Sequence, residues 1–259
     1  MSHSILDRTP NADSPLATAP ETVLVVGATG GIGQAFCEAL VSRFPKAQLI
    51  RMARSIEKLK PLSSDTQDLE IDLLKEASIN AAVDALPNQA QIDWVFIATG
   101  WLHDDHFQPE KSYRSLSGDH LTKAFQLNTF GPALLVKNLL QRFNRKHPVT
   151  IGLLTARVGS ISDNRLGGWY SYRASKAALN MFIKNYAIEC DRSRRSISIV
   201  GLQPGTTDTK LSAPFQRGVA PENLQTTEYT ATQLVSVMAA LELEDSGLLF
   251  DFLGLPFDP

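Results

Sequence analysis

A short apolar run followed by a glycine-rich turn constrains the fold of this chain more than any other feature. Residues 23–26 read Val-Leu-Val-Val, which is typical of a strand buried on both faces. Residues 27–33 then read Gly-Ala-Thr-Gly-Gly-Ile-Gly, and residues 36–44 repeat apolar side chains at helical spacing. Glycines at such a turn let backbone N–H groups approach a pyrophosphate, and the start of the helix favours the anion. The segment predicts a dinucleotide site in an α/β protein.

A tyrosine and a lysine four residues apart form the second informative pattern. If residues 170–180 are helical, Tyr172 and Lys176 lie one turn apart on the same face. An ammonium beside a phenol favours the phenolate, so we expect the pKa of Tyr172 to lie below its usual value of about 10. Such a pair suits a general acid or base acting on a carbonyl or an alcohol. The same spacing also occurs on plain amphipathic helices, so the pair gains weight only beside the glycine turn.

Composition limits the classes of function. The 259 residues suffice for one large α/β domain, and the net charge of -2 favours neither nucleic acid nor an anionic membrane as partner. No apolar run reaches the roughly 20 residues of a membrane helix, and no secretory signal is evident. Cys37 and Cys190 fall in helical patterns, which predicts buried free thiols and agrees with a cytoplasmic location. Residues 1–20 carry three prolines among small polar residues and predict a flexible leader, which leaves residues 21–259 as a single domain.

The two motifs together carry a family resemblance. Gly27, Gly31 and Gly33 have the spacing G-x-x-x-G-x-G, and with Tyr172-x-x-x-Lys176 they make the chain resemble the short-chain dehydrogenase/reductase superfamily from about residue 22 to the end. Residues 157–161 (Arg-Val-Gly-Ser-Ile) and 167–170 (Gly-Gly-Trp-Tyr) resemble its C-factor and sniffer-like carbonyl reductase branch. The resemblance implies a Rossmann fold, a doubly wound parallel sheet of about seven strands flanked by helices.

The end of the second expected strand bears on the choice of cofactor. Residues 48–52 are followed by Ala53-Arg54-Ser55, with no acidic residue between 51 and 55. An acid at this place suits the bare 2′-hydroxyl of NAD, whereas the planar fork of an arginine suits a 2′-phosphate. Arg54, with Arg51 as the alternative, therefore predicts NADP(H). The competing interpretation is an arginine that is merely exposed at a strand end.

The resemblance implies further contacts with the cofactor. Asp72 would lie near the adenine, although it could instead cap the expected helix 75–86. Thr206 and Thr209 would contact the nicotinamide amide or the phosphates. The full expected set is Gly27, Thr29, Gly30, Gly31, Ile32, Gly33, Arg54, Asp72, Leu73, Thr99, Gly100, Tyr172, Lys176, Pro204, Gly205, Thr206 and Thr209.

The resemblance also assigns catalytic roles. Tyr172 would transfer the proton, and Lys176 would lower its pKa and hold the ribose. Asn128, a poor helix former in an apolar helical pattern, would kink that helix and hold a water in a proton relay. The competing interpretation of Asn128 is a buried amide satisfied by the backbone.

One position departs from the family pattern. Ala156 occupies the place of the serine that usually hydrogen-bonds the substrate carbonyl, at the end of the expected strand 149–155. Either Thr155 or Ser160 would have to supply the hydroxyl. Because Thr155 and Ala156 point to opposite sides of an extended strand, Thr155 could do so only if the strand end bends.

The remaining segments yield more general expectations. Strands are expected at 69–73, 92–98, 197–202 and 248–252, and a last helix at 228–241. Residues 210–225 have two prolines and little periodicity, as expected of a mobile loop over a substrate. Residues 103–106 (His-Asp-Asp-His) match no common zinc spacing and predict a solvated loop, so no metal is expected. In relatives the helices that carry Asn128 and Tyr172 form a subunit interface, which implies a homodimer or homotetramer.

The sequence thus predicts an NADP(H)-dependent oxidoreductase that interconverts a small-molecule carbonyl and alcohol by hydride transfer, with Tyr172 as general acid/base. A protein of another class remains as the alternative: a nucleotide-binding signalling or regulatory protein on the same fold with weak turnover. Ala156 supports that alternative, because losing one oxyanion-type donor costs on the order of 10²–10³ in rate.

Overall fold

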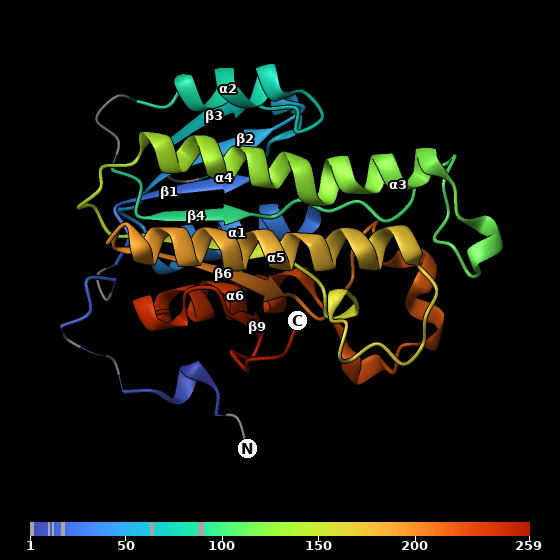
Figure 1. The fold of residues 1–259 in the computed structure, drawn as a ribbon. Coiled ribbons are helices and arrows are strands. Elements are labelled where there is room, and N and C mark those ends of the chain that lie inside the picture. Colours follow the sequence, from blue (N-terminus) through green and yellow to red (C-terminus); the bar gives the residue numbers. More distant parts are fainter. Residues whose placement is uncertain (1–2, 10, 12, 17–18, 63–64, 88–90) are drawn as a thin grey trace.

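The computed structural model describes residues 3–9, 11, 13–16, 19–62, 65–87 and 91–259. In this part of the chain seven parallel strands form one sheet in the order β3-β2-β1-β4-β5-β6-β9, as the Rossmann prediction requires (Figure 1). Central strands are buried along their length because helices cover both faces of the sheet. The strands are β1 (Thr22–Val26), β2 (Gln48–Ala53), β3 (Thr66–Glu70), β4 (Trp94–Ile97), β5 (Val149–Leu154), β6 (Ile197–Gln203) and β9 (Leu249–Asp251).

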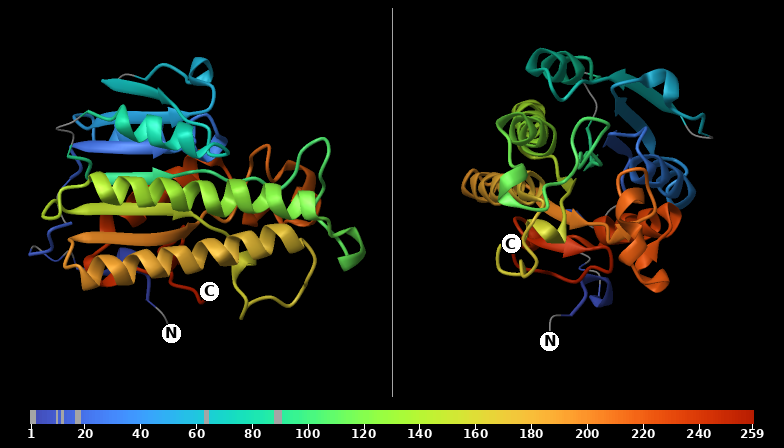
Figure 2. Two further views of the ribbon diagram at one scale, coloured as in Figure 1. Left: turned by 45° about the horizontal axis from the view of Figure 1, so that its top comes forward. Right: turned by 90° about the vertical axis from the view of Figure 1, so that its right-hand side faces the viewer.

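Two layers of helices enclose the sheet (Figure 2). On one face lie α1 (Gly31–Arg43) and α6 (Thr227–Ala240), which pack against each other. The opposite face carries α2 (Glu76–Asp84), α4 (Gly131–Arg142) and α5 (Tyr170–Arg192), with α3 (Gly118–Phe125) running into α4. No helix of the described residues is long and apolar enough to cross a membrane.

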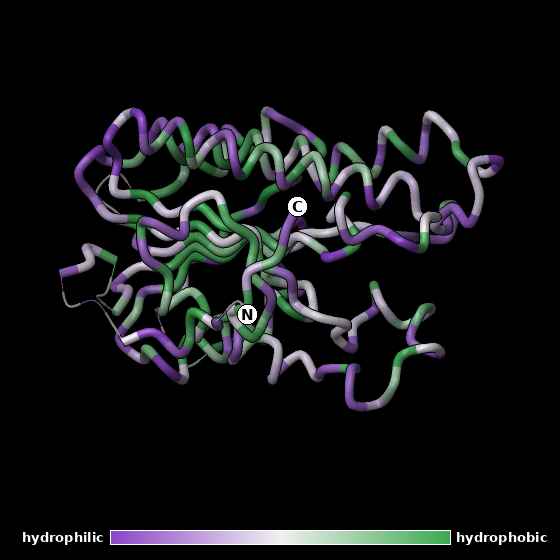
Figure 3. The backbone as a smooth tube through the Cα atoms, turned by 60° about the horizontal axis from the view of Figure 1, so that its bottom comes forward, coloured by the Kyte–Doolittle hydropathy of each residue, from purple (hydrophilic) through white to green (hydrophobic). Residues whose placement is uncertain are grey.

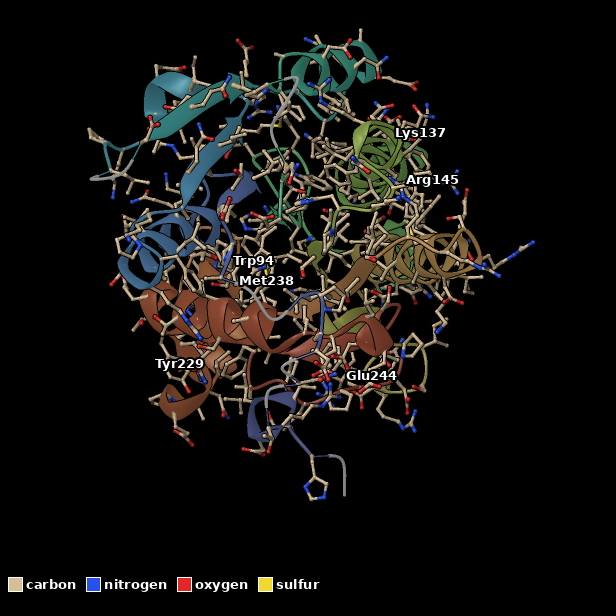
Figure 4. All side chains as sticks on the ribbon, turned by 90° about the vertical axis from the view of Figure 1, so that its left-hand side faces the viewer. Trp94, Lys137, Arg145, Tyr229, Met238 and Glu244 are labelled. Atoms are coloured by element: carbon tan, nitrogen blue, oxygen red, sulfur yellow. The ribbon has the colours of Figure 1, made fainter. Side chains whose placement is uncertain are left out.

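Each face of the sheet has its own apolar cluster, and the hydrophobic backbone segments gather at the strands between the helix layers (Figure 3). Trp94 of β4 and Met238 of α6 meet in the cluster on the α1 side, whereas Lys137 of α4 lies at the outer surface (Figure 4). Cys37 belongs to that same cluster and Cys190 to the cluster on the other face. Both cysteines are buried free thiols, as predicted.

The strand order fixes where a ligand can enter. The chain leaves β1 toward β2 on one side and β4 joins β1 on the other, so the loops after β1 and β4 diverge at their carboxyl ends. Ligands of open parallel sheets bind at this topological switch point. Here Gly27, in a left-handed conformation (φ 83°), packs so closely that an added Cβ atom would lie 3.0 Å from the Ala98 carbonyl oxygen. The irregular segments that follow the other strands extend from the same end of the sheet (Figure 1).

Most predicted elements begin and end within two residues of the observed ones, and the third strand is the exception. A strand was expected at 69–73, but β3 spans Thr66–Glu70. The start of the observed strand is hard to see in the sequence, because its polar and partly exposed residues give no apolar pattern. Leu73 lies beyond it and packs against the first residue of α4, where a Cβ atom added at Gly131 would lie 2.7 Å from the Leu73 Cβ.

The described N-terminal residues pack on the domain, which differs from the expected loosely draped leader. Ile5 is 1% exposed, lies in the α1-side cluster and donates its backbone N–H to the Gly254 carbonyl at 3.0 Å. Arg8 forms an ion pair with the buried carboxylate of Asp245, in which its Nη1 donates to both carboxylate oxygens. Ser4 donates its hydroxyl to the Leu253 carbonyl at 2.5 Å. This apolar and ionic attachment was not evident from a composition of prolines and small polar residues.

Candidate active site

Helix α5 places Tyr172 and Lys176 one turn apart, as their spacing predicts. Lys176 is 2% exposed, and its Nζ donates to the Leu154 carbonyl at 2.8 Å, at the end of β5. Nζ also lies 5.9 Å from the centroid of the Tyr172 ring. Gly159 makes room for the lysine stem, because a Cβ atom there would lie 2.8 Å from the Lys176 Cβ. The pair therefore stands at the carboxyl edge of the sheet.

Burial shifts the pKa values of these two groups in opposite directions. It lowers the pKa of Lys176 to about 7 and raises the pKa of Tyr172 to about 12. This direction is opposite to the expected lowering of the Tyr172 pKa, because burial disfavours the phenolate. Tyr172 is protonated at neutral pH, which is the form that can donate a proton to a carbonyl oxygen.

Asn128 lies in a π-helical turn, Gln126–Phe130, that separates α3 from α4, so the expected irregularity of this helix is present. The side chain is fully buried and clamps the loop after β4. Its Nδ2 donates to the Trp101 carbonyl at 2.8 Å and to the Ser175 hydroxyl at 3.0 Å, and its Oδ1 accepts from the Trp101 N–H at 2.7 Å. The side-chain amide is thus satisfied largely by backbone, as the competing interpretation held, and the water relay stays a prediction.

Both hydroxyls that could replace the missing serine already have hydrogen-bond partners within the protein. Thr155 is 2% exposed and donates its hydroxyl to Asn180 Oδ1 at 2.5 Å, behind β5 and beneath α5. Ser160 is also 2% exposed, and its hydroxyl accepts from the Asp163 N–H at 3.2 Å within its own turn. Ala156, which follows Thr155, is only half-buried. Both hydroxyls are therefore engaged in bonds within the protein, and a role of either one at the substrate carbonyl stays a prediction.

The glycine turn has the features that a dinucleotide phosphate requires. The N-cap of α1 is Gly30, and no side chain caps this end of the helix. Gly31 is exposed, whereas Gly33 is buried, and a Cβ atom at Gly33 would lie 2.3 Å from the Gly27 carbonyl oxygen. Uncapped N–H groups with positive helix-end potential, and no side chains in the way, fit a pyrophosphate. Thr29 and Ile32 lie in the same turn, exposed and half-buried respectively.

The structure separates the two arginines at the end of β2. Arg51 is 5% exposed, and its guanidinium is engaged by both carboxylate oxygens of Asp68 at 2.7 Å and by the Lys60 carbonyl. The fork of Arg51 is thus fully used within the protein. Arg54 is exposed at the strand end, three residues further on. Of the two candidates, Arg54 is the one that a phosphate could reach.

Asp72 is engaged locally. One of its carboxylate oxygens accepts from the Leu74 N–H at 3.1 Å, and the other lies 3.4 Å from the Lys75 Nζ. These contacts resemble the helix-start role that was left open, although α2 itself begins at Glu76 with Lys75 as its N-cap. An adenine contact of Asp72 stays a prediction, and so does one of its neighbour Leu73.

Other predicted cofactor residues gather around the same turn. The Thr99 hydroxyl is buried and has no hydrogen-bond partner among the described residues, next to Gly27 and at the end of β4. Such an orphaned donor is unusual in a native protein and fits a polar ligand group. Thr209 also reaches the turn, because a Cβ atom at Gly31 would lie 3.0 Å from its methyl group.

The segment after β6 supplies the rest of the expected set. Pro204 precedes Gly205, whose left-handed conformation (φ 72°) turns the chain against Phe252. Thr206 lies exposed in β7 (Thr206–Thr207), which pairs with β8 (Leu224–Gln225). The expected irregular loop 210–225 thus contains this short strand and 3₁₀ turns. Its two-stranded pairing ties the loop base to the strand end.

A cavity of about 550 Å³ lies between the loop after β4 and the loop after β6. Gly100, His103 and Leu211 are among its lining residues. Gly100 connects it to the catalytic pair, because a Cβ atom there would lie 3.8 Å from the Lys176 Nζ. The size falls within the range of small-molecule sites. The cavity therefore reaches the neighbourhood of the Lys176 ammonium through Gly100.

The segment 103–106 is engaged in packing. Asp104 forms an ion pair with Lys123. Burial opposes ionisation of Asp104, but hydrogen bonds from Lys123 and from two backbone N–H groups outweigh it and hold its pKa at about 2. His103 Nε2 lies 3.1 Å from the Leu211 carbonyl oxygen. Among the described residues no three metal-ligating side chains are grouped together.

Sequence reasoning missed a buried group at the start of α5. Glu110 is 2% exposed, and its carboxylate accepts bonds from the Ser171 hydroxyl and backbone N–H, and lies 3.2 Å from His120 Nδ1. Its carbonyl accepts from the Trp169 N–H at 2.6 Å. Trp169 itself is left-handed (φ 50°). The neighbouring pair Gly167-Gly168 was a visible signal of an unusual turn, whereas nothing near Glu110 in the sequence indicated its partners.

The fold and the site define a Rossmann-type α/β protein with a dinucleotide-type turn at the switch point of its sheet. Comparison with protein families gives the family. The model of the short chain dehydrogenase family matches residues 21–219, and the chain belongs to that family of oxidoreductases. The family expected from the glycine turn and the Tyr–Lys pair is therefore confirmed.

Individual relatives agree with this assignment. The chain is 30% identical over 238 residues to 1-hydroxy-2-glutathionyl-2-methyl-3-butene dehydrogenase of Rhodococcus sp. (strain AD45), covering 87% of this chain and 94% of the relative. Carbonyl reductase Sniffer of D. melanogaster superposes with a TM-score of 0.78 at 22% identity, covering 92% and 99% of the two chains. An NADPH-bound carbonyl reductase from chicken fatty liver gives 0.78 at 21% identity, with the same coverage. The structural neighbours share the fold and include the sniffer type that residues 157–161 and 167–170 resemble.

Proposed function

We propose that the protein is an NADP(H)-dependent oxidoreductase that interconverts a small-molecule carbonyl and its alcohol. The observation that carries the proposal is the pairing of Tyr172 with Lys176 at the carboxyl edge of the sheet, where the Lys176 Nζ lies 5.9 Å from the centroid of the Tyr172 ring and donates to the Leu154 carbonyl. Relatives named as a dehydrogenase of an alcohol and as carbonyl reductases support this pair of substrates. A cytoplasmic location remains part of the proposal.

The cofactor would supply the hydride, and the residues of the chain would bind, orient and handle the proton. The uncapped start of α1 and the glycine turn would hold the phosphates. Tyr172 would give its proton to the carbonyl oxygen during reduction and take it back during oxidation. Lys176, fixed on the Leu154 carbonyl, would hold the ribose and, when protonated, stabilise the phenolate that Tyr172 leaves. Asn128 would hold the loop after β4 against α5, because it hydrogen-bonds both Trp101 in that loop and Ser175 in that helix.

A screen of carbonyl compounds tests this function. The protein is mixed with NADPH and a panel of reactive aldehydes, ketones and diketones, and the loss of NADPH absorbance is followed. We expect turnover of at least one compound at a rate well above that without protein. The protein used must be shown to bind NADPH. If it then consumes NADPH no faster than the protein-free control with any compound of the panel, the proposal is contradicted.

The cofactor preference depends on Arg54. Because Arg54 is exposed at the end of β2, NADPH is expected to bind more tightly than NADH, and Arg54→Ala to weaken NADPH binding by about tenfold while changing NADH binding little. Fluorescence titration measures the dissociation constants of NADPH and NADH. Arg43→Ala, on the far end of α1, is a matched control that should change neither. A wild-type preference for NADH would remove the proposed role of Arg54.

The second candidate function is a nucleotide-binding regulator with weak turnover, which Ala156 and the engaged hydroxyls of Thr155 and Ser160 favour. Ala156→Ser separates the two. If the wild-type site lacks a donor for the carbonyl, the added hydroxyl is expected to raise kcat on the order of 10²-fold. An unchanged kcat in an active wild-type enzyme would show that another group already polarises the carbonyl, and would argue against the regulator.

The assembly is proposed to be a homodimer or homotetramer through α4 and α5. Phe130, Met181 and Ile188 are exposed large apolar side chains on and near these helices. Exposed apolar side chains of this kind support an interface, because contact with a second copy would remove them from water. Light scattering coupled to gel filtration measures the mass directly.

A further inference from the structure

Three aromatic side chains, Trp169, Phe215 and His103, form a connected row beside the catalytic tyrosine, here called the aromatic wall. The Trp169 ring lies 6.3 Å from the Tyr172 ring and 5.0 Å from the Phe215 ring, in edge-to-face arrangements. Phe215 in turn lies 5.5 Å from His103, which lines the cavity. The row therefore runs from the proton donor to the cavity.

The members of the aromatic wall come from three separate segments. His103 follows β4, Trp169 immediately precedes α5, and Phe215 belongs to a 3₁₀ helix, Ala213–Gly218, in the loop after β6. All three are half-buried, so each ring keeps part of its surface open. Aromatic rings bury large apolar areas and prefer edge-to-face or offset contacts with other rings. A partly exposed row of this kind, ending at a proton donor, is suited to a flat apolar group on a substrate.

The backbone at Trp169 is held in a conformation that a tryptophan rarely adopts. Gly167, Gly168 and Trp169 are left-handed in succession, with φ of 63°, 66° and 50°. Glycine adopts this conformation freely, but a bulky residue does so at a cost, and such strain is retained where the surroundings enforce it. The strain thus accompanies the placement of the Trp169 ring between Tyr172 and Phe215.

Glu110 is the residue that enforces this turn. Its carbonyl accepts the Trp169 N–H at 2.6 Å, while its carboxylate binds Ser171, two residues further, through both hydroxyl and N–H. His120 fixes the carboxylate from the other side at 3.2 Å. Glu110 and its hydrogen bonds, here called the clamp, therefore hold Trp169 and Ser171, the residues on either side of Tyr170. Ser171 immediately precedes Tyr172. A buried carboxylate with several donors is expected to hold its geometry tightly.

From these contacts we infer that the aromatic wall determines specificity, with Trp169 and Phe215 receiving an aromatic or similarly flat apolar group attached to the substrate carbonyl, and with Glu110 as a positioning residue for Trp169. The inference rests on the proposed carbonyl reduction and names the substrate class of the same site. It goes further by assigning selectivity to a ring from before α5 and a ring from the loop after β6. Substrates whose carbonyl carries only small alkyl groups would gain little from the wall.

Two diketones that differ in one substituent test the inference: phenylpropanedione carries a phenyl ring where butanedione carries a methyl group. Trp169→Ala is expected to raise KM for phenylpropanedione by about fivefold to tenfold with kcat nearly unchanged, because it removes a contact made equally in ground and transition states. KM for butanedione should change by less than about twofold. Trp169→Phe should restore most of the wild-type KM, and Tyr113→Ala, which truncates a 68% exposed ring outside the wall, should change neither substrate.

Two further variants separate a specific role from general damage. Phe215→Ala should raise KM for phenylpropanedione and not for butanedione. If both rings contact the same phenyl group, the double variant with Trp169→Ala should raise KM by less than the product of the two single effects. Glu110→Gln keeps the size and the backbone carbonyl of the clamp but weakens the carboxylate bonds to Ser171. It should shift the ratio of the two KM values in the same direction as Trp169→Ala.

The outcomes distinguish this inference from the proposed function. If wild-type protein reduces neither diketone nor any other carbonyl, the proposed function fails. If it reduces both diketones and Trp169→Ala lowers kcat equally for both, Trp169 merely supports Tyr172 and the specificity role is overturned. An unchanged KM for phenylpropanedione in Trp169→Ala or Phe215→Ala overturns it as well. A Glu110→Gln variant with an unchanged ratio of KM values removes Glu110 from the positioning role.

Discussion

Replacing Tyr172 by phenylalanine is expected to lower kcat for carbonyl reduction by about 10²–10⁴-fold while leaving the fold and NADPH binding nearly unchanged. The substitution removes only the hydroxyl, which is the proton donor in the proposed reaction. A large effect is expected because proton transfer by a positioned side chain contributes about 10²–10⁴-fold. Burial raises the pKa of Tyr172 to about 12, so the wild-type hydroxyl carries its proton at neutral pH and can donate it as negative charge develops on the carbonyl oxygen.

A neighbouring residue provides the matched control for this prediction. Tyr170 begins the same helix two residues earlier and is 38% exposed, so Tyr170→Phe removes an equivalent hydroxyl outside the catalytic pair. We expect its kcat to remain within about twofold of the wild type. Steady-state rates on any active diketone, with fluorescence titration of NADPH for each variant, make the comparison. A Tyr172→Phe variant as active as Tyr170→Phe would end the acid–base assignment.

The sheet and the cofactor turn could be predicted because their determinants are local in the sequence. A strand buried on both faces shows as a continuous apolar run, and Gly33 must be glycine for a steric reason that the turn itself sets. The strand β3 lacked such a signal, because among the described residues it lies at the edge of the sheet and its side chains are half-buried or exposed. The other strands could be predicted because they are buried on both faces and therefore read as apolar runs, not because strands in general have a recognisable sequence.

The chemistry of the site was less predictable because it depends on packing between distant segments. The spacing of Tyr172 and Lys176 correctly gave their shared helix face, but the pKa directions follow from desolvation by β5 and the loops around it. Thr155 and Ser160 were reasonable donors until the structure placed Thr155 on Asn180 and Ser160 in its own turn. Side-chain direction at a strand end is set by the next turn of chain, which carries no periodic pattern.

The glycine turn gives the second prediction of large effect, because Gly33→Ala places a Cβ atom 2.3 Å from the Gly27 carbonyl oxygen. Both groups are held by backbone, so the clash can be relieved only by moving the turn. Alanine in a helix interior gains about 0.5–1 kcal/mol over glycine, whereas overpacking costs about 1–3 kcal/mol, so net destabilisation is expected. The displaced turn should also lower the affinity for NADPH by more than tenfold, since the phosphate donors move with it.

Two other glycines calibrate the size of this effect. At Gly31 an added Cβ atom meets side-chain methyl groups rather than backbone, those of Thr209 at 3.0 Å and Thr227 at 3.4 Å, so Gly31→Ala should weaken NADPH binding less and leave stability nearly unchanged. At Gly118, the first residue of α3, nothing lies within 4 Å, and Gly118→Ala should be neutral or slightly stabilising. Urea unfolding and NADPH titration of the three variants should rank them Gly33, Gly31, Gly118 in decreasing damage. If Gly33→Ala is as stable as Gly118→Ala and binds NADPH equally well, the close approach of α1 to β1 does not govern cofactor binding.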